Sequence, residues 1–309
     1  MRLTFMGTPE AAAPSLRRCL SDGHEVVAVW TQPDRPLGRG RKMAMPAMKL
    51  LALKYGLKVQ QPASIKTAEA EALFAASDPD VAVIVAYGRV LPGEFLCTPR
   101  LGCINLHFSL LPLYRGAAPV NWTIVNGEPK TGVTTMVVDE GLDSGPILLQ
   151  RETPICQNET AQDLTGRLAI MGAELLGETL AQISHIAPRI QDHQKATFAP
   201  MLKKEDGLID WSTNAFAIEC RIRGFQPWPN AYTDCSSRHL IIWRAIPTTN
   251  DSNQATAGEI VTAHGDHLIV KCGGGTALRL VEVQPEGKRR MAVREFLNGT
   301  RLRIGDVLG

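Results

Sequence analysis

Val81-Ala-Val-Ile-Val-Ala86 is apolar at every position, with no polar residue to interrupt the run. An apolar run of this length is expected for a strand that is covered on both faces of a parallel sheet. Leu3–Met6, Glu25–Trp30 and Gly102–Phe108 are further strand candidates, and an Ala/Leu-rich segment that ends at Leu20 separates the first two. Strands that alternate with helical segments predict a doubly wound, Rossmann-like α/β domain with a mostly parallel sheet.

The chain beyond residue 130 predicts further strands, a long helix and a second, smaller domain. Thr131–Val138 and Ile147–Glu152 continue the strand series, and Thr160 is suited to cap a helical pattern that runs to Ile186. After a connector, a helix near Thr213–Arg223 precedes short β runs that Gly, Asn and Asp turns separate, and this spacing predicts a small antiparallel barrel. These β runs are His239–Ala245, Ala257–Thr262, His267–Lys271 and Ala277–Gln284.

Length and composition are those of an ordinary globular protein. The chain has 309 residues, which at about 150 per domain suggests two domains. Its hydrophobic fraction of 44% and charged fraction of 21% are normal for such a protein. The patterns divide it into an α/β domain at 1–188, a linker at 189–208 and a C-terminal domain at 209–309.

Charge is almost balanced along the chain. Lys and Arg number 33 and Asp and Glu 31, so the net charge of +2 does not by itself indicate a nucleic-acid or membrane partner. Residues 189–309 carry 16 basic and 13 acidic side chains, a mild excess that is consistent with contact to RNA.

Several classes of protein are disfavoured by what the sequence lacks. Seven cysteines form no CxxC motif, which favours a reducing cytoplasm without structural zinc or disulfides. The longest strongly apolar run, Val81–Tyr87, is far below the ~20 residues that span a bilayer. Gly7-Thr-Pro-Glu10 lacks the GxGxxG fingerprint, and no GxxxxGK[ST] motif occurs. We therefore expect a cytoplasmic protein that contacts no membrane and binds no dinucleotide or metal. A monomer is expected as well, although no sequence pattern gives the oligomeric state.

Chemistry-bearing residues gather at the end of the Gly102–Phe108 strand. Side chains two apart on a strand point to the same face, so Asn105 and His107 are expected to project together. At the carboxyl end of a sheet strand they would converge on one ligand atom. Taken alone, an Asn-x-His pair more often satisfies the backbone groups of a loop, and this alternative stays open.

Asp143 lies in the second group, the acidic, Gly-rich loop Asp139–Pro146 between two strand candidates. In isolation such a loop is more often a solvated turn. A carboxylate brought beside an imidazole orients it and stabilises its protonated form. Asn, His and Asp lack a Ser or Cys nucleophile, so they suit direct transfer, in which the substrate attacks and the enzyme stabilises an oxyanion.

Two motifs resemble a known family. Asn105–Trp122 (NLHFSLLPLYRGAAPVNW) and Asp139–Leu148 (DEGLDSGPIL) resemble the signature of the formyltransferases that use 10-formyltetrahydrofolate. That resemblance implies Asn105, His107 and Asp143 as a catalytic triad, 10-formyltetrahydrofolate as formyl donor, and no metal. It also implies that the SLLPLYRG loop shapes the cleft, with lesser roles for Tyr114 and Arg115. Residues implied for folate binding are Tyr87, Gly88, Val90, Leu91, Ser109, Leu110, Leu111 and Pro112.

The acceptor is indicated by the 31–46 segment, which shows neither helix nor strand periodicity. Loops this long are unusual unless functional or disordered, and basic ones suit phosphate backbones. A solvated charged loop is the alternative. The segment resembles the inserted loop of methionyl-tRNA formyltransferases, which implies initiator methionyl-tRNA as the partner. Its candidate phosphate contacts are Arg35, Arg39, Arg41 and Lys42.

The C-terminal part extends the resemblance to almost the whole chain. Arg221–Ala231 and the stretch from Ala257 to Gly299 resemble the OB-like second domain of the same subfamily, which helps to hold tRNA. Candidate phosphate contacts are Lys203 and Lys204 in the linker and the cluster Lys288, Arg289 and Arg290; for each, a solvated face is an equal alternative.

The resemblance thus implies formyl transfer from 10-formyltetrahydrofolate to the α-amino group of initiator methionyl-tRNA. Sugar-nucleotide formyltransferases share the core signature, but the basic loop and the second domain argue against them. A formyltetrahydrofolate hydrolase does not explain the basic loop. A non-catalytic RNA-binding protein has no use for Asn105, His107 and Asp143 together.

Overall fold

The computed structural model describes residues 1–37, 42–235, 238–249 and 255–309, and these form two compact units. The first unit comprises Met1–Pro119, Lys130–Pro154 and Thr165–Pro200. The second comprises Val120–Pro129, Ile155–Leu164 and Met201–Gly309. The chain therefore passes between the units more than once, and the boundaries expected at 188 and 208 stay predictions.

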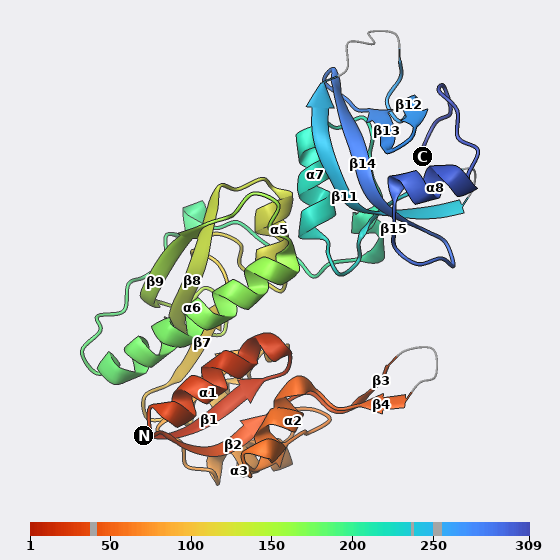
Figure 1. Cartoon of the computed structure of the whole chain (residues 1–309). Helices are drawn as coiled ribbons and strands as arrows, with labels where there is room; N and C mark the ends of the chain where they lie inside the picture. The colour runs from red at the N-terminus through yellow and green to blue at the C-terminus, as the bar shows by residue number, and fades with distance from the viewer. Residues whose placement is uncertain (38–41, 236–237, 250–254) are drawn as a thin grey trace. The chain divides into compact units, whose positions relative to one another are not determined.

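The first unit is built on a seven-stranded sheet with the order β5-β2-β1-β6-β7-β8-β9 (Figure 1). The strands from β5 to β7 are parallel, whereas β8 runs antiparallel to both β7 and β9. All five residues of β6 are buried, as the apolar run predicts. The strands are β1 Arg2–Gly7, β2 Glu25–Trp30, β5 Val59–Gln60, β6 Val81–Val85, β7 Cys103–His107, β8 Lys130–Val137 and β9 Ile147–Pro154.

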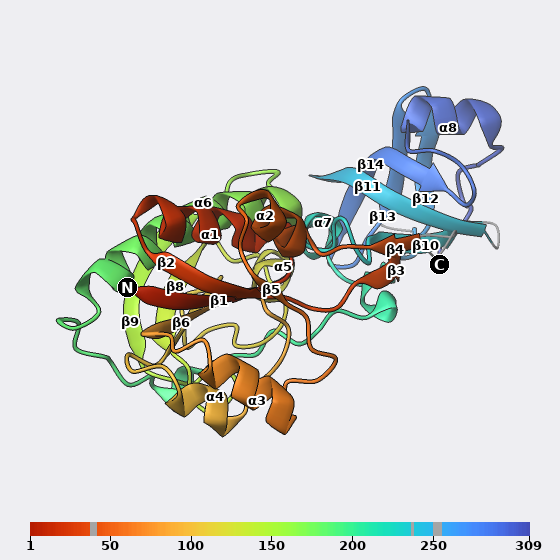
Figure 2. The same cartoon turned by 90° about the horizontal axis from the view of Figure 1, so that it is seen from below.

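Helices cover both faces of this sheet, with α1, α2 and α6 on one side and α3 and α4 on the other (Figure 2). On the second side the rings of Trp30, Phe74 and Phe95 pack together, with 4.3 Å between the centroids of the stacked Phe74 and Phe95. The mostly parallel α/β prediction is confirmed. The helices are α1 Ala13–Ser21, α2 Ala47–Lys54, α3 Ala68–Ala75, α4 Gly93–Cys97 and α6 Ala161–Gln182, with short 3-10 turns at Glu10–Ala12 and His193–Lys195. Between β7 and β8 lies α5 Pro119–Val125, which belongs to the second unit from Val120 onward.

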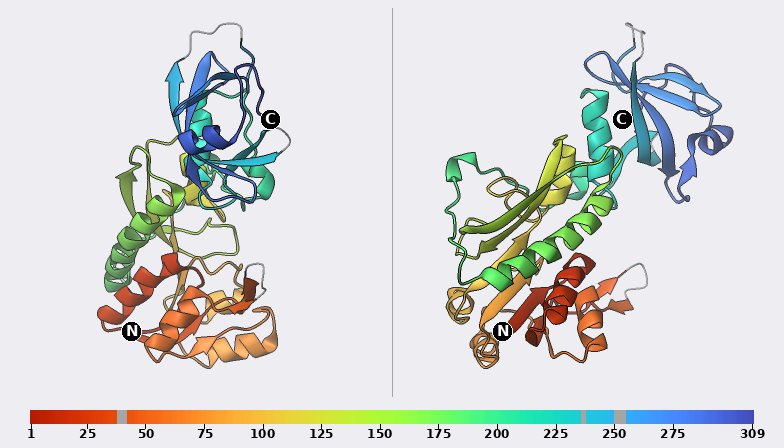
Figure 3. Two further views of the ribbon diagram at one scale, coloured as in Figure 1. Left: turned by 45° about the vertical axis from the view of Figure 1, so that its right-hand side comes forward. Right: turned by 60° about the vertical axis from the view of Figure 1, so that its left-hand side comes forward.

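The long helix α6 begins where the sequence predicts. The Thr160 hydroxyl accepts a hydrogen bond from the Asp163 amide, and the Asp163 carboxylate accepts one from the Thr160 amide, which together form a capping box. Farther along, α6 approaches β7 closely, because a Cβ at Gly172 would lie 2.8 Å from Leu106 Cδ2. Both panels of Figure 3 show this helix, in green, alongside the strands that it covers.

The prediction of a segment without regular structure at 31–46 is wrong. Arg35–Leu37 (β3) and Lys42–Ala44 (β4) pair as a short antiparallel ladder that projects from the first unit (Figure 1). Three-residue strands are too short to show the alternation on which the prediction relied. Residues 38–41 lie outside the described residues.

The second unit contains a six-stranded antiparallel sheet with the path β10-β11-β14-β13-β12, on which β15 pairs with β14. Leu240, Ile242, Leu268 and Leu280 point to its fully buried side, where Ile218 of α7 joins them. The antiparallel C-terminal domain is confirmed, and β10 and β12 lie at the two ends of the path. The elements are α7 Ala215–Gly224, β10 Ala231–Cys235, β11 Arg238–Thr249, β12 Ile260–His264, β13 His267–Lys271, β14 Thr276–Pro285, β15 Met291–Ala292 and α8 Val293–Gly299, with a 3-10 turn at Lys204–Gly207.

Candidate active site

Three side chains meet where β7 ends. Asn105 and His107 lie two apart on β7, and both reach Asp143, which belongs to the loop between β8 and β9. Asn105 Nδ2 donates to Asp143 Oδ1 at 3.3 Å, and His107 Nδ1 lies 3.7 Å from Asp143 Oδ2. The site therefore brings together the amide, imidazole and carboxylate that the sequence analysis expected to converge.

Asp143 reaches β7 because β8 runs back along it. The antiparallel register pairs His107 with Thr134 and Ile104 with Val137, so β8 ends beside the start of β7. The following loop then folds over the strand, and the Val138 amide donates to the Cys103 carbonyl.

Both ring nitrogens of His107 face an acceptor. Nε2 lies 2.9 Å from the carbonyl oxygen of Tyr114, and Nδ1 faces the Asp143 carboxylate. Because a carbonyl oxygen can only accept, Nε2 carries the hydrogen of this bond. The ring is buried, so its orientation is fixed by these two neighbours. In this arrangement the His107 Nε2–H group is engaged by the protein.

Two residues of the site adopt the left-handed backbone conformation. Asp143 has φ 48° and Tyr114 has φ 59°, a region that is costly for a bulky side chain. Residues held in this way persist only where surrounding contacts over-determine them, and they cluster at functional sites. Gly116 follows with φ 122°, and its amide donates to Asp143 Oδ2 at 2.9 Å. A Cβ there would lie 2.6 Å from the Ala199 carbonyl oxygen, so this position requires glycine.

No sequence pattern singles out Gln191, yet its buried side chain contacts both loops of the site. Its Nε2 donates to the Asp143 and Gly145 carbonyls, and its Oε1 accepts from the Arg115 guanidinium. Gln191 lies 48 residues from Asp143, in the segment that the sequence analysis assigned to a linker. Only the spatial arrangement reveals it.

The predicted folate residues follow the carboxyl ends of two neighbouring parallel strands, β6 and β7. Tyr87 is buried, and its carbonyl accepts from the Thr8 hydroxyl and the Gln32 side-chain amide. Burial raises the pKa of the Tyr87 hydroxyl, and nearby Arg89 lowers it in part. Within the described residues this hydroxyl has no hydrogen-bond partner.

Among the other folate candidates, Gly88 has φ 81°, and Leu91 is buried whereas Val90 is exposed. On the β7 side, Ser109 Oγ donates to the Leu113 carbonyl, and Leu111 N donates to the Thr134 hydroxyl. The remaining candidates are Leu110, which is half-buried, and Pro112, whose carbonyl accepts from Thr197 N.

The base of the β3–β4 ladder is fastened to the β6 end of the site. Gln32 Oε1 accepts from Arg35 and Arg89, while its Nε2 donates to the Tyr87 carbonyl. Asp34 accepts from Lys49 and Gln61, and these hydrogen bonds hold the pKa of its carboxyl below the usual range.

The candidate tRNA contacts in this ladder fall into two groups. Arg35 is exposed on β3, and the backbone of Lys42 pairs within β4. Arg39 and Arg41 lie outside the described residues.

The candidate tRNA contacts in the second unit differ in whether they form an ion pair with an acidic side chain. Lys203 and Lys204 are exposed, as is Lys288. Arg289 forms an ion pair with Glu295, and Arg290 with Glu282, while the Arg290 guanidinium also lies over the Trp243 ring. A phosphate at either arginine would have to compete with a carboxylate already in place.

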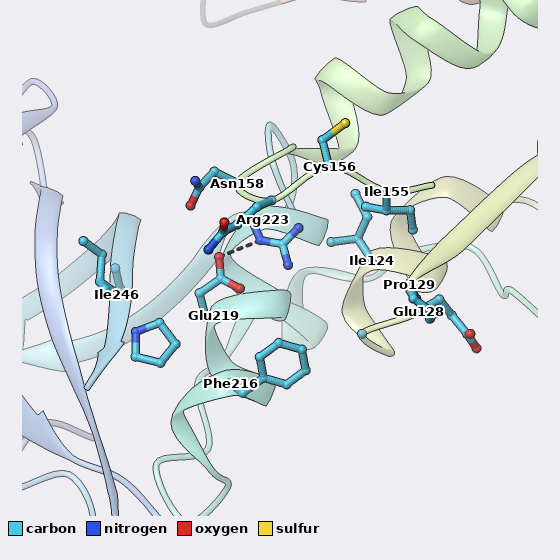
Figure 4. A pocket seen from close by; sticks show the side chains of 14 residues that line it. Ile124, Glu128, Pro129, Ile155, Cys156, Asn158, Phe216, Glu219, Arg223 and Ile246 are labelled. Carbon is cyan, nitrogen blue, oxygen red and sulfur yellow. Dashed lines mark hydrogen bonds and ion pairs between the residues drawn. The ribbon is translucent and has the colours of Figure 1, made fainter. Parts of the chain in front are cut away.

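A cavity of about 390 Å³ lies in the second unit and contains none of the predicted site residues (Figure 4). Phe216, Ile124 and Ile246 supply apolar lining, and the Arg223 guanidinium faces Glu219 on the same helix at 2.6 Å. The Glu159 carbonyl also accepts from Arg223.

The described part of the chain contains neither a cluster suited to bind a metal ion nor a helix suited to span a membrane. Within those ranges no group of three or more His, Cys, Asp or Glu side chains is placed to hold a metal ion. None of the helices described is long and apolar enough to cross a membrane.

Comparison with known proteins identifies the family. The formyl transferase family matches residues 1–180, and the formyl transferase C-terminal domain matches residues 201–301. The methionyl-tRNA formyltransferase of Citrifermentans bemidjiense is 47% identical over 311 residues, covering 100% of this chain and 96% of that protein. The enzyme of the same name from Caldanaerobacter subterraneus is also 47% identical and is covered completely, as is this chain. The chain therefore belongs to the formyl transferase family, and the relatives with which it aligns end to end are methionyl-tRNA formyltransferases.

Solved structures share the fold at low sequence identity. An N-formyltransferase from Helicobacter canadensis, in complex with folinic acid and dTDP-3-aminofucose, is 19% identical, with a TM-score of 0.65. The alignment covers 92% of this chain and 98% of that one. HypX from Aquifex aeolicus, in complex with tetrahydrofolic acid, has a TM-score of 0.61 at 15% identity; the alignment covers 96% of this chain but only 47% of HypX.

Proposed function

We propose that this chain transfers a formyl group from 10-formyltetrahydrofolate to the α-amino group of initiator methionyl-tRNA. The observation that carries the proposal is the meeting of Asn105, His107 and Asp143 in a chain whose full-length relatives are methionyl-tRNA formyltransferases. The same relatives favour this acceptor over a sugar nucleotide. Folates bound to the Helicobacter canadensis enzyme and to HypX support a folate donor.

The reaction needs no protein nucleophile. The neutral α-amino nitrogen attacks the formyl carbon, a C–N bond forms, and the carbonyl electron pair moves to the oxygen. The tetrahedral intermediate then collapses as the bond between the formyl carbon and N10 breaks, and the amine proton passes to N10. Because the donor is already an activated formamide, the protein supplies position, oxyanion stabilisation and proton transfer.

The three side chains divide these tasks. Asn105 donates one amide hydrogen to Asp143, and within the described residues its second has no acceptor, so it is available to the oxyanion. Asp143 orients His107 and accepts or relays the amine proton. His107, held by the Tyr114 carbonyl and Asp143, supplies positive potential to the site when it is protonated.

The donor is assigned to the strand ends beside the triad. Tyr87, Gly88, Val90 and Leu91 follow β6, and Ser109–Pro112 follow β7. The sheet order reverses between β1 and β6, and ligands of open α/β sheets bind outside the carboxyl ends of strands at such a point. Thr8 and Tyr87, joined by a hydrogen bond, lie at that point.

The acceptor is assigned to the basic β3–β4 segment and to exposed lysines of the second unit. Phosphate contacts supply affinity for RNA without reading its sequence. Replacing Arg41 and Lys42 with Ala is expected to raise KM for methionyl-tRNA far more than KM for the folate donor. Steady-state kinetics with each substrate varied in turn checks this, and equal effects on both constants would remove the segment from the acceptor site.

The function is tested by product analysis. Purified protein is incubated with 10-formyltetrahydrofolate and initiator methionyl-tRNA, and formylmethionyl-tRNA is separated from free formate. We expect the formylated tRNA, and we expect Asn105→Ala to lower kcat about 10²–10³-fold with little change in tRNA binding. Formate alone would identify a hydrolase, and RNA retention without turnover a binding protein; either outcome overturns the proposal.

A further inference from the structure

Both the oxygen and the nitrogen of the Gln191 side-chain amide form hydrogen bonds. The residue is 3% exposed. Oε1 accepts from Arg115 Nε at 3.1 Å and from Arg115 Nη2 at 2.7 Å. Nε2 donates to the Asp143 carbonyl at 2.9 Å and to the Gly145 carbonyl at 2.7 Å. These contacts determine which way the amide points, because a guanidinium can only donate and a carbonyl can only accept.

Arg115 fixes this orientation from the opposite side. The side chain is 5% exposed, and in the described part of the chain its polar contacts are Gln191 and His193 Nδ1, with no carboxylate among them. A buried guanidinium stays charged and needs acceptors, so it keeps Gln191 Oε1 turned toward itself. Nε2 is thereby directed at the Asp143 loop.

The same contacts join the two loops that carry the site. Arg115 stands between Tyr114, which accepts from His107, and Gly116, which donates to Asp143. Gln191 adds a second connection between these loops, through Arg115 on one side and the carbonyl of Asp143 on the other. Asp143 has a left-handed backbone at φ 48°, which surrounding contacts must maintain.

We infer that Gln191 is a positioning residue for the reaction: it holds the backbone of the Asp143 loop so that the carboxylate faces Asn105 and His107. The inference rests on the proposed function and deepens it. Gln191 acts through Asp143 and does not contact substrate, so it should affect kcat and leave the binding of both substrates unchanged.

Gln191→Glu separates positioning from support of the fold. One carboxylate oxygen still accepts from Arg115 and gives this buried cation an acidic partner. The other oxygen replaces the donor and confronts two carbonyl oxygens, which displaces the loop. We expect kcat per folded enzyme to fall about 10²-fold, as for a displacement on the order of 1 Å at a reacting group. KM for methionyl-tRNA and for the donor should stay within about threefold.

A double-mutant cycle shows whether the effect runs through Asp143. In a background of Asp143→Asn, adding Gln191→Glu should lower kcat little further, because the group being positioned has already lost its charge. Gln194→Glu is the matched control, since Gln194 is exposed three residues farther along, and its kcat should equal that of the wild type.

Each outcome decides the inference. If Gln191→Glu lowers thermal stability, Gln191→Met, which is similar in size and has no amide, is measured in the same way, with folded enzyme counted by circular dichroism. Wild-type kcat per folded enzyme in both variants overturns the inference, as does a loss that multiplies fully with that of Asp143→Asn. A wild-type enzyme that forms no formylmethionyl-tRNA overturns the proposed function instead.

Discussion

Asp143 connects the other residues of the site to one another. Its two carboxylate oxygens contact Asn105, His107 and the Gly116 amide, and its carbonyl contacts Gln191. The residue therefore links β7 to the loops on either side of it. Asn has nearly the same shape, but its amide nitrogen cannot accept, so Asp143→Asn removes the charge together with the hydrogen bond from either Asn105 or Gly116.

Asp143→Asn should lower kcat about 10²–10⁴-fold, the range for loss of a proton-transferring group. KM for both substrates should change little, because the backbone contacts of the loop remain. Glu140→Gln, an exposed change in the same loop, is the control and should leave kcat unaffected. Steady-state kinetics measures both variants; a normal kcat in Asp143→Asn would exclude a role for the charge.

The cysteines differ in burial, and burial disfavours the thiolate form. Burial raises the pKa of Cys103, two residues before Asn105, to about 12, and Cys19 and Cys272 are raised likewise to about 12. Cys97 and Cys156 are exposed, whereas the other five cysteines are buried. Two thiols per chain should therefore react rapidly with a disulfide reagent in the native protein.

Labelling at Cys103 should stay slow between pH 7 and pH 9, because its thiol is still protonated there, whereas an ordinary thiol ionises in this range. Mass spectrometry of the labelled peptides checks this. Fast reaction of Cys103, with Cys97 as the internal reference, would show that the strand beneath the site opens readily.

At the scale of elements, sequence patterns predict those strands and helices that bury an apolar face over several residues. The predicted strand Glu25–Trp30 has its observed bounds and the predicted strand at β6 ends within one residue of them, because the first is rich in β-branched residues and the second is apolar throughout. The Met291–Ala292 and Arg35–Leu37 strands were not found, since two or three residues show no period.

The residues of the site likewise fall into those that a local sequence pattern reveals and those that it does not. Asn105 and His107 share a face by the period of a strand, which the sequence shows directly. That Asp143 reaches them depends on the antiparallel return of β8, and that Gln191 supports Asp143 depends on the path of residues 189–200. Contacts over 38 and 48 residues follow from topology, which local patterns do not encode. The resemblance to a family supplied Asp143, and nothing supplied Gln191.

Helix α6 and strand β7 meet at a residue that has no side chain. A Cβ at Gly172 would lie 2.8 Å from Leu106, which stands between Asn105 and His107 on β7. Gly172→Ala favours the helix by its propensity but forces Leu106 to move. We expect a net loss of about 1–3 kcal/mol and a lower kcat.

Gly166→Ala, on the same helix, is the matched control, because a Cβ at Gly166 would meet no atom within 4 Å. It should stabilise the protein by about 0.4–1 kcal/mol. Urea denaturation compares the two variants; equal stability would show that Leu106 adapts without cost.

At the scale of the whole molecule, affinity for RNA must come from local groups of basic side chains, because the net charge is only +2. Lys203, Lys204 and Lys288 are exposed, whereas Arg289 and Arg290 each contact a glutamate. Binding to phosphates releases counterions from the RNA, and salt opposes that release.

Raising KCl from about 50 to 200 mM should therefore increase KM for methionyl-tRNA by a factor of about ten or more, if the protein contacts several phosphates. KM for the folate donor should change far less. Lys203→Ala with Lys204→Ala should flatten the salt dependence more than Arg289→Ala does, because Glu295 already compensates that arginine. If KM for the folate donor rises with salt as much as KM for methionyl-tRNA does, then salt affects the enzyme in general and not its contacts with phosphates.

Residues 189–200, which include Gln191, run along the first unit and form what we call the strap. The backbone of Arg189 pairs with that of Ile147, and Phe198 forms a bridge with Arg115. A protein cut after residue 188 would keep Asn105, His107 and Asp143 yet lose the amide that holds their loop, so an intact triad would not guarantee turnover. Chimaeras that exchange C-terminal parts between relatives should therefore be joined after Pro200, where the first unit ends, so that each catalytic half keeps its own strap.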